Sequence, residues 1–263
     1  MDLASNPTRT LARFALTASW LFALAFVSRA EAASGTVCHF QAVPAGHVLT
    51  ATVSTSQCPS GSGYSYTLPS EGLRVCSNSP VPAPYVTSQV DPNTTVCRGL
   101  KRYYIYQARD GILACAFSPI PSPFVITGID PSTSSCQGAQ RYYLYAARDN
   151  QSICAQSPIP YGFVVTNVGP TSMSCGGQMA RTLRTPYDGI SVCTTSPIPD
   201  GFVIPGTFPT TQCNGLAAHQ LRTPTDRMAI CRYSPVPTGW TTGSQLPVSR
   251  CTNESYGYQL LKI

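Results

Sequence analysis

The chain contains little charge, since only 11% of its 263 residues are Asp, Glu, Lys or Arg. Its Lys and Arg residues form no cluster, which argues against a nucleic-acid partner. The three histidines, His39, His47 and His219, do not stand at the spacing of metal ligands, and no Gly-x-Ser-x-Gly motif is present. We therefore expect a protein that is not an enzyme, with no catalytic residue, metal or cofactor.

The cysteines lack the close pairs that structural zinc sites use, because no two of the twelve lie nearer than 18 positions apart. An even number of regularly spaced cysteines is typical of a disulfide framework in an oxidising compartment. We expect six disulfides, and two pairings respect the spacing. Either the cysteines join in consecutive pairs along the chain, or each second cysteine joins the next first one and leaves Cys38 to pair with Cys251. The twelve residues are Cys38, Cys58, Cys76, Cys97, Cys115, Cys136, Cys154, Cys175, Cys193, Cys213, Cys231 and Cys251.

A long apolar run occurs only near the N-terminus, at residues 14–27, after Arg9 and Arg13 and before Ala30 and Ala32. This pattern predicts a secretory signal peptide over 1–32, followed by a single β-repeat domain over 33–263. We expect a secreted or periplasmic product without a membrane span after cleavage. Removal of the peptide takes away three of 17 basic and two of 11 acidic residues, and a mild net charge of +5 remains.

Successive cysteines are separated alternately by 20 or 21 and by 18 residues, which reveals a repeat of about 39 residues. Five of the first cysteines are followed by Ser-Pro-(Ile/Val)-Pro and then by an aromatic residue. Frequent Pro, Gly, Ser and Thr between recurring apolar residues predict short strands and turns, and hence the all-β class. The predicted units are 38–75, 76–114, 115–153, 154–192, 193–230 and 231–263.

The ends of the chain suggest how these units are arranged. Asp110-Gly111 and Asp188-Gly189 are hairpin signals, because Gly tolerates the positive φ of a tight turn. Residues 34–38 match the strand after such a turn, and residues 258–263 match the strand before one. We therefore expect a closed toroid resembling a small six-bladed β-propeller, in which the N- and C-terminal strands complete one blade. The alternatives are an open β-solenoid or tandem β mini-domains.

An acid stands five residues before the first cysteine of each of the last five units. An Asp at a turn commonly accepts a hydrogen bond from the backbone two residues ahead, so we expect a structural role for these acids. They are Glu71, Asp110, Asp149, Asp188 and Asp226.

Two near-identical segments, 101–106 and 140–145, place tyrosines beside arginines. Strand alternation would put Tyr104 and Tyr106 on one face and Tyr103 on the other. Tyrosine rings and guanidinium donors suit sugar rings, although such tyrosines could instead fill the core between units. The candidate ligand-binding residues are Arg102, Tyr104, Tyr106, Arg109, Arg141, Tyr143, Tyr145, Arg148, Arg184 and Arg222.

These features favour a binding protein that recognises glycans or a cell-surface component at several like sites. The alternative function is a structural or adhesive extracellular or envelope protein that acts through protein contacts. We expect a monomer, although self-assembly would follow if the terminal strands exchanged between molecules.

Overall fold

The structure is a computed structural model that describes residues 33–252 and 254–263. The predicted signal peptide at 1–32 lies outside the described residues. Ala33–Ile263 is one compact unit by its internal contacts. The described residues contain no helix with the length and apolar character needed to traverse a bilayer.

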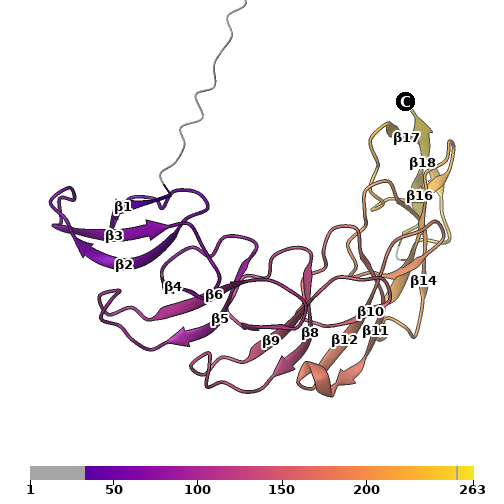
Figure 1. Cartoon of the computed structure of the whole chain (residues 1–263). Coiled ribbons are helices and arrows are strands. Elements are labelled where there is room, and N and C mark those ends of the chain that lie inside the picture. The colour runs from indigo at the N-terminus through magenta and orange to yellow at the C-terminus, as the bar shows by residue number, and fades with distance from the viewer. Residues whose placement is uncertain (1–32, 253) are drawn as a thin grey trace, which may run out of the picture. The chain divides into compact units, whose positions relative to one another are not determined.

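The fold is all-β and consists of six separate three-stranded antiparallel sheets (Figure 1). In each sheet the third strand lies in the centre, between the first and the second. We call each sheet with its loops a module. The prediction of an all-β fold built from six disulfide-stapled repeats is confirmed.

The strands of the first three modules follow in chain order. Module 1 has β1 (Ser34–Cys38), β2 (Val48–Ser54) and β3 (Ser62–Thr67); module 2 has β4 (Leu73–Cys76), β5 (Tyr85–Asp91) and β6 (Arg102–Gln107); module 3 has β7 (Ile112–Cys115), β8 (Phe124–Asp130) and β9 (Arg141–Ala146).

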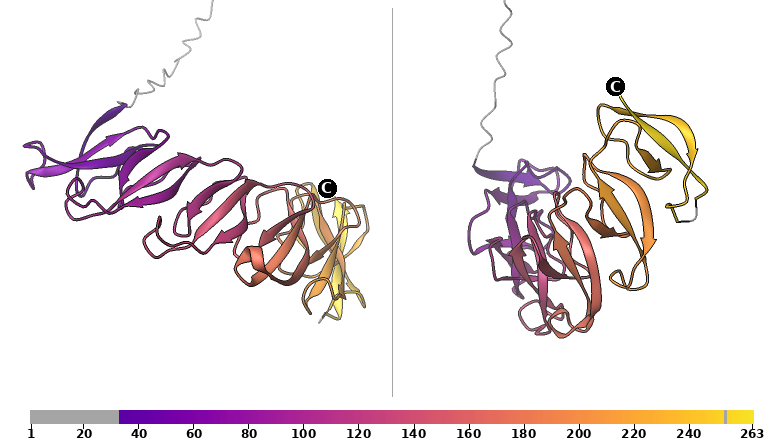
Figure 2. Two further views of the ribbon diagram at one scale, coloured as in Figure 1. Left: turned by 60° about the horizontal axis from the view of Figure 1, so that its bottom comes forward. Right: turned by 90° about the vertical axis from the view of Figure 1, so that its right-hand side faces the viewer.

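The last three modules repeat this order, with one short 3-10 helix, η1 (Met173–Cys175), in module 4. Module 4 has β10 (Gln151–Cys154), β11 (Val164–Ser172) and β12 (Gln178–Arg184); module 5 has β13 (Ser191–Cys193), β14 (Val203–Pro209) and β15 (Ala217–Arg222); module 6 has β16 (Ala229–Cys231), β17 (Trp240–Pro247) and β18 (Tyr256–Lys262). Figure 2 shows the same part of the chain from two further sides.

Each module contains one disulfide, between the end of its first strand and the loop before its third strand. The pairs are Cys38–Cys58, Cys76–Cys97, Cys115–Cys136, Cys154–Cys175, Cys193–Cys213 and Cys231–Cys251. Of the two pairings that the spacing allowed, the one within units is present. A bridge from Cys38 to Cys251 is not formed.

The prediction that the N- and C-terminal strands complete one blade is wrong. β1 pairs with β3 of its own module, and β18 lies between β16 and β17. The main contacts between modules join successive ones: β2 with β4, β5 with β7, β8 with β10, β11 with β13, and β14 with β16. Strand pairing therefore supports the alternative of tandem β modules or an open β-solenoid, with six whole sheets and no half-units.

The error came from the Asp-Gly turns. Gly111 and Gly189 do have positive φ values, of 80° and 85°, as predicted. However, the strands on either side of each turn belong to different modules and do not pair with each other. β7, which follows Gly111, pairs instead with β9, about 30 residues further along the chain. The Asp-Gly sequence thus predicted the backbone conformation of the turn correctly, but it did not predict which strand pairs with the next one.

The hydrophobic core lies between modules rather than within one. One cluster joins Val125 of module 3, Ile153 and Leu183 of module 4, and Cys193 and Cys213 of module 5. The disulfide of a module therefore packs behind the sheet of the preceding one. A three-stranded sheet is too small to bury an apolar face alone, and stacking with its neighbours supplies the missing cover.

The serine of the Ser-Pro motif joins successive modules. Its hydroxyl accepts a hydrogen bond from a backbone amide of the preceding module and donates one to the carbonyl of the proline that follows. Both hydrogen-bonding functions of a buried hydroxyl are thus satisfied. The five amide-to-hydroxyl bonds are Leu49 to Ser79 at 2.7 Å, Thr87 to Ser118 at 2.8 Å, Ile126 to Ser157 at 2.8 Å, Val165 to Ser196 at 2.9 Å, and Ile204 to Ser234 at 2.8 Å.

The second strand of every module has an irregular register, typical of a β-bulge, and in modules 1 to 5 the shift lies at or just after that amide. In module 2 the shift lies between Thr87 and Gln89, so that Ser88 has no opposite residue on β6. Beyond the bulge, the Val90 amide donates to the carbonyl of Ser135 in module 3. The bulge therefore leaves backbone amides of one sheet free to donate hydrogen bonds to the next module.

The second strand of module 6 departs from the other five. Where those strands have a fully buried Val followed by Leu, Thr, Ile or Val, β17 has the exposed residues Thr241 and Thr242. Gln245 is likewise exposed, at a position where module 2 has the buried Val90. A polar outer face of this kind is typical of capping repeats in stacked arrays.

The serine hydrogen bond predicts a measurable loss of stability in Ser157→Ala. The variant leaves the buried amide of Ile126 without an acceptor, which costs about 1–3 kcal/mol in free energy of unfolding. Urea denaturation followed by circular dichroism measures this loss. The control is Ser152→Ala, at an exposed position on β10. Equal stability of the two variants would show that the bond contributes nothing.

The polar face of module 6 predicts a change of assembly in the double variant Thr241→Val, Thr242→Ile. The substitutions recreate the apolar pair of the inner modules on a face that nothing in the described residues covers, so we expect concentration-dependent self-association. Light scattering coupled to size-exclusion chromatography detects it. A variant that keeps the mass of the wild type at all concentrations would contradict this explanation of the two threonines.

Candidate functional site: grooves between modules

The predicted alternation of tyrosines on β6 and β9 is present. Tyr103 packs with Ile105 in the core, whereas Tyr104 and Tyr106 are partly exposed on the other face. On β9, Tyr143 and Tyr145 are 38% and 36% exposed. The alternative that these four tyrosines fill the core between units is therefore wrong for their side of the sheet.

Tyr104 lies beneath an arginine of the neighbouring strand. The guanidinium carbon of Arg74 on β4 is 5.0 Å from the ring centroid of Tyr104, directly across the strand pair. One face of this ring is thus already occupied by a cation. Tyr106 makes no such contact and lines a groove described below.

Arg102 and Arg141 are the least exposed of the predicted arginines, at 12% and 20% of the side chain. Each forms an ion pair with an aspartate at the end of the second strand of its module. Arg102 lies 2.7 Å from Asp91, and Arg141 lies 2.5 Å from Asp130. These arginines are therefore held in place by the sheet.

The other four predicted arginines pair with the acids of the inter-module turns. Arg109 lies 3.4 Å from Glu71, Arg184 lies 3.2 Å from Asp149, and Arg222 lies 2.9 Å from Asp188. Arg148 pairs in the same way with Asp110. All of these partners are more than a third exposed, so solvent screening leaves each pair a weak contributor to stability.

The turn acids also hold the backbone, but not in the predicted way. Each carboxylate accepts a hydrogen bond from a backbone amide at the end of the third strand of the same module, either that of its last residue or of the next one, rather than from an amide two residues ahead. An acid beside the first strand thereby extends the strand ladder by one bond. The bonds are Gln107 to Glu71 at 3.0 Å, Ala146 to Asp110 at 2.7 Å, Thr185 to Asp149 at 2.7 Å, Thr223 to Asp188 at 2.7 Å, and Lys262 to Asp226 at 3.2 Å.

These contacts shift the titration of the acids. The amide of Thr185, followed by the guanidinium of Arg184, lowers the pKa of Asp149 below its ordinary value. The amide of Thr223 and then Arg222 lower the pKa of Asp188 in the same way. Both carboxylates are therefore ionised in the folded protein under all but strongly acidic conditions.

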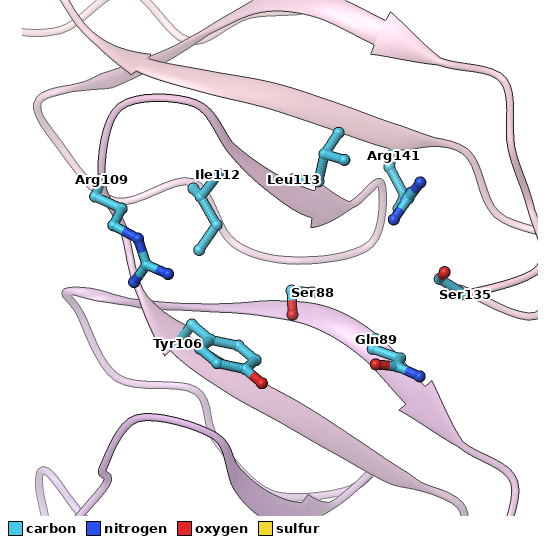
Figure 3. A pocket seen from close by; sticks show the side chains of 8 residues that line it. All are labelled: Ser88, Gln89, Tyr106, Arg109, Ile112, Leu113, Ser135 and Arg141. Atoms are coloured by element: carbon cyan, nitrogen blue, oxygen red, sulfur yellow. The ribbon is translucent and has the colours of Figure 1, made fainter.

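A groove lies between modules 2 and 3, with a volume of about 230 Å³. Ser88, Gln89 and Tyr106 of module 2 line one side, and the apolar side chains of β7 lie opposite them (Figure 3). Arg109 and Arg141 also line it. The complete lining is Ser88, Gln89, Tyr106, Arg109, Ile112, Leu113, Ser135 and Arg141.

A groove at the same positions lies between modules 4 and 5, with a volume of about 450 Å³. Counted from the cysteines, its bulge residue Thr166 corresponds to Ser88, Asn167 to Gln89, and Arg184 to Tyr106. Tyr187 corresponds to Arg109, so the Tyr and the Arg have exchanged places. The complete lining is Asn150, Thr166, Asn167, Thr182, Arg184, Tyr187, Gly189, Ile190, Ser191 and Gln212.

Between modules 5 and 6 the same positions form a third groove of about 380 Å³ with a different character. Pro205 replaces the hydroxyl of the bulge residue, and Met228 lies at the position of Ile112. Arg250, just before the second cysteine, is its one charged lining residue. This groove has neither the tyrosine nor the amide of the first two.

The predicted residues are therefore only partly brought together. Tyr106, Arg109 and Arg141 meet in one groove, and Arg184 lines another. The others do not line these grooves: Arg102, Tyr104, Tyr143, Tyr145, Arg148 and Arg222. The prediction missed the bulge residues, the amides of Gln89 and Asn167, and Tyr187. The constant number of residues between the first cysteine and these positions was a usable signal in the sequence. The sequence did not reveal the β-bulge, however, and therefore gave no reason to place these residues in a groove.

The described residues contain no group of three or more His, Cys, Asp or Glu side chains that could hold a metal ion. His219 is instead part of a polar cluster, in which its Nδ1 lies 2.9 Å from the hydroxyl of Thr207, and the same hydroxyl contacts Tyr233. Partial burial lowers the pKa of His219.

Comparison with known proteins adds no relative. No family model, curated protein or solved structure shows a significant match to this chain. The grooves themselves must carry the functional argument.

The turn acids predict a specific dependence of stability on pH. Because folding lowers the pKa of Asp149 and Asp188, their contribution is present above the unfolded value near 3.8 and is lost as the pH falls through the folded pKa. The double variant Asp149→Asn, Asp188→Asn should be less stable than the wild type at pH 7 and approach it near pH 3. Urea midpoints at the two pH values test this.

The control for this experiment is Asp200→Asn, since in the described structure Asp200 accepts neither a strand amide nor an arginine. Its urea midpoints should follow those of the wild type at both pH values. A constant difference between the double variant and the wild type across the range would refute the role of the two ionised carboxylates.

Proposed function

We propose that the protein is a secreted, non-enzymatic binding protein that recognises a glycan or a glycan-bearing cell-surface component at several grooves along its modules. The observation that carries this proposal is the recurrence of one kind of lining at two module junctions. Each groove combines one tyrosine, at least one guanidinium, a carboxamide, and hydroxyls, over a floor with an aliphatic side chain.

Such a lining suits saccharides. A tyrosine ring covers the apolar C–H face of a sugar, while carboxamides and hydroxyls donate to and accept from its hydroxyl groups. Gln89 and Asn167 stand at the equivalent position beside the bulge in the two grooves. In each groove this carboxamide offers both hydrogen-bond donors and an acceptor. Guanidinium groups add donors in a fixed plane.

Several weak sites on one chain would act together on a polymeric ligand. Once one groove is occupied, the second binds at the effective concentration that the first imposes, so the overall affinity exceeds that of either groove. The six disulfides and the predicted signal peptide support a secreted location, since disulfides persist in oxidising compartments.

A second candidate function is adhesion through protein contacts. A hollow of about 410 Å³ between the Ser-Pro loops of modules 4 and 5 is lined mainly by proline and apolar side chains. Tyr161, at its rim, is 84% exposed. Exposed aromatic residues beside apolar hollows are common in protein interfaces. Both terminal strands pair inside their own modules, so neither is the unpaired half-hairpin from which strand exchange was expected.

Tyrosine truncation separates the two functions. A glycan array should first identify a ligand, and titration calorimetry should then measure its affinity for each variant. Tyr106→Ala and Tyr187→Ala should each weaken binding by about fivefold to tenfold, because each removes the aromatic surface of one groove. Tyr161→Ala should leave glycan binding unchanged.

If no saccharide binds the folded protein better than millimolar, the glycan proposal fails. If Tyr161→Ala alone abolishes capture of a ligand, and the groove variants bind normally, the adhesive function is the correct one. Circular dichroism confirms that each variant keeps its fold.

A further inference from the structure

The grooves share a feature that the proposed function does not require: each is lined by arginine and none by a carboxylate. This holds for Arg109 and Arg141 between modules 2 and 3, for Arg184 between modules 4 and 5, and for Arg250 between modules 5 and 6. A further polar hollow, of about 320 Å³, lies between modules 1 and 2 and repeats it with Arg98. Arg109, Arg141 and Arg184 each pair with an acid that does not itself line the groove. The charged side chains of the lining are therefore all positive, and the N–H groups that these pairs do not use can donate to a negatively charged ligand.

The arginines of the first groove differ in how firmly they are held. Arg141 is 20% exposed and lies 2.5 Å from Asp130, so its position is fixed. Arg109 is 61% exposed and pairs at 3.4 Å with Glu71, which is itself 48% exposed. An exposed pair of this length is weak, so a ligand anion can replace Glu71 at little cost.

Arg184 also retains donors for a ligand. Its ion pair uses Nε, which lies 3.2 Å from Asp149. In the described structure its two terminal nitrogens make no hydrogen bond. These nitrogens form the planar edge that binds a carboxylate or sulfate by two parallel bonds.

Arg250 completes the pattern at the third junction. Its backbone carbonyl is fixed by a 2.6 Å hydrogen bond from the Thr207 amide of the preceding module. Its side chain forms no ion pair with any described residue. A positive side chain is therefore available even where the tyrosine and the amide are absent.

We infer that these grooves bind an anionic oligosaccharide, in which a carboxylate or sulfate group meets the arginine and the adjoining sugar ring meets the tyrosine and hydroxyls. This inference rests on the proposed glycan-binding function and specifies the ligand class of the same grooves. Because an arginine lines a groove or hollow at four of the five junctions, the ligand that fits best is a polymer with an anionic group on many of its residues.

The test compares an acidic oligosaccharide with its uncharged ester and with two other anionic polymers. Titration calorimetry measures binding of an oligogalacturonate, of the same oligomer with its carboxylates methyl-esterified, and of a sulfated oligosaccharide of similar length. Polyglutamate serves as an anion without sugar rings. The acidic oligosaccharides should bind at least about tenfold more tightly than the ester, and their affinity should fall as salt rises from about 50 to 500 mM.

Two matched pairs of variants locate the site. Arg184→Gln should weaken binding of the acidic oligosaccharide by about tenfold, whereas Arg222→Gln should not, although Arg222 makes the corresponding ion pair in the next module. Arg109→Gln and Arg148→Gln form the second pair. Arg109 lines a groove and Arg148 does not, so only Arg109→Gln should weaken binding. Both members of a pair lose a similar exposed ion pair, so a difference between them reports ligand contact.

The outcomes test separately whether the ligand is anionic, whether it binds in the grooves, and whether the protein binds glycans at all. Equal binding of the oligogalacturonate and its ester would overturn the inference of an anionic ligand but leave glycan binding in place. Polyglutamate binding as tightly as the acidic sugars would show simple charge attraction and also overturn it. Equal losses in Arg184→Gln and Arg222→Gln would place the ligand outside the grooves. Absence of binding to every saccharide would refute the proposed function itself.

Discussion

The hydrogen bond from a backbone amide of one module to the serine hydroxyl of the next is the interaction on which the rest of the structure depends. A sheet of three short strands cannot bury its own apolar face, so each module is stable only against its neighbours. Stacking two sheets would leave backbone amides of the second strand buried between them. The serine accepts that bond at all five junctions, for example from Ile126 to Ser157 at 2.8 Å. Its own proton goes to the carbonyl of the next residue, so the hydroxyl both accepts and donates a hydrogen bond.

The β-bulge makes this stacking possible and at the same time creates the grooves. By removing one residue from the ladder, it directs the amides before and after it toward the next module, as with Thr87 and Val90. The bulge residue itself then lies at the edge of the junction, where Ser88 and Thr166 line the grooves. The grooves are therefore a geometric consequence of how the modules pack. Their lining can change without loss of packing, as Pro205 and Met228 show at the last junction.

The regular spacing of cysteines was enough to predict six stapled β repeats, because each repeat places its cysteines at the same two points of the same sheet. It left the disulfide pairing open, since five of the six bridges in the alternative pairing would close loops of 18 residues, nearly as long as the 20 or 21 residues of the bridges that form. The hairpin signals were misleading for a physical reason. The positive φ of Gly111 permits a reversal of the chain, but the strand after it gains more by pairing within its own module, where Cys115 is tied to Cys136. Thr241 and Thr242 argued against a closed ring, because their polarity breaks the apolar pattern that the other five second strands bury against the next module.

The candidate arginines show why residue type alone could not define a site. Arg184 and Arg222 have the same sequence context and make the same ion pair with a turn acid, yet only Arg184 lines a groove. The difference lies in the following module. Tyr187 and Gln212 complete the groove beside Arg184, whereas Met228 and Val248 occupy the junction after Arg222. A groove in this protein is thus a property of two successive modules, and its lining can change at one junction while the ion pairs and strand ladders of both modules remain intact.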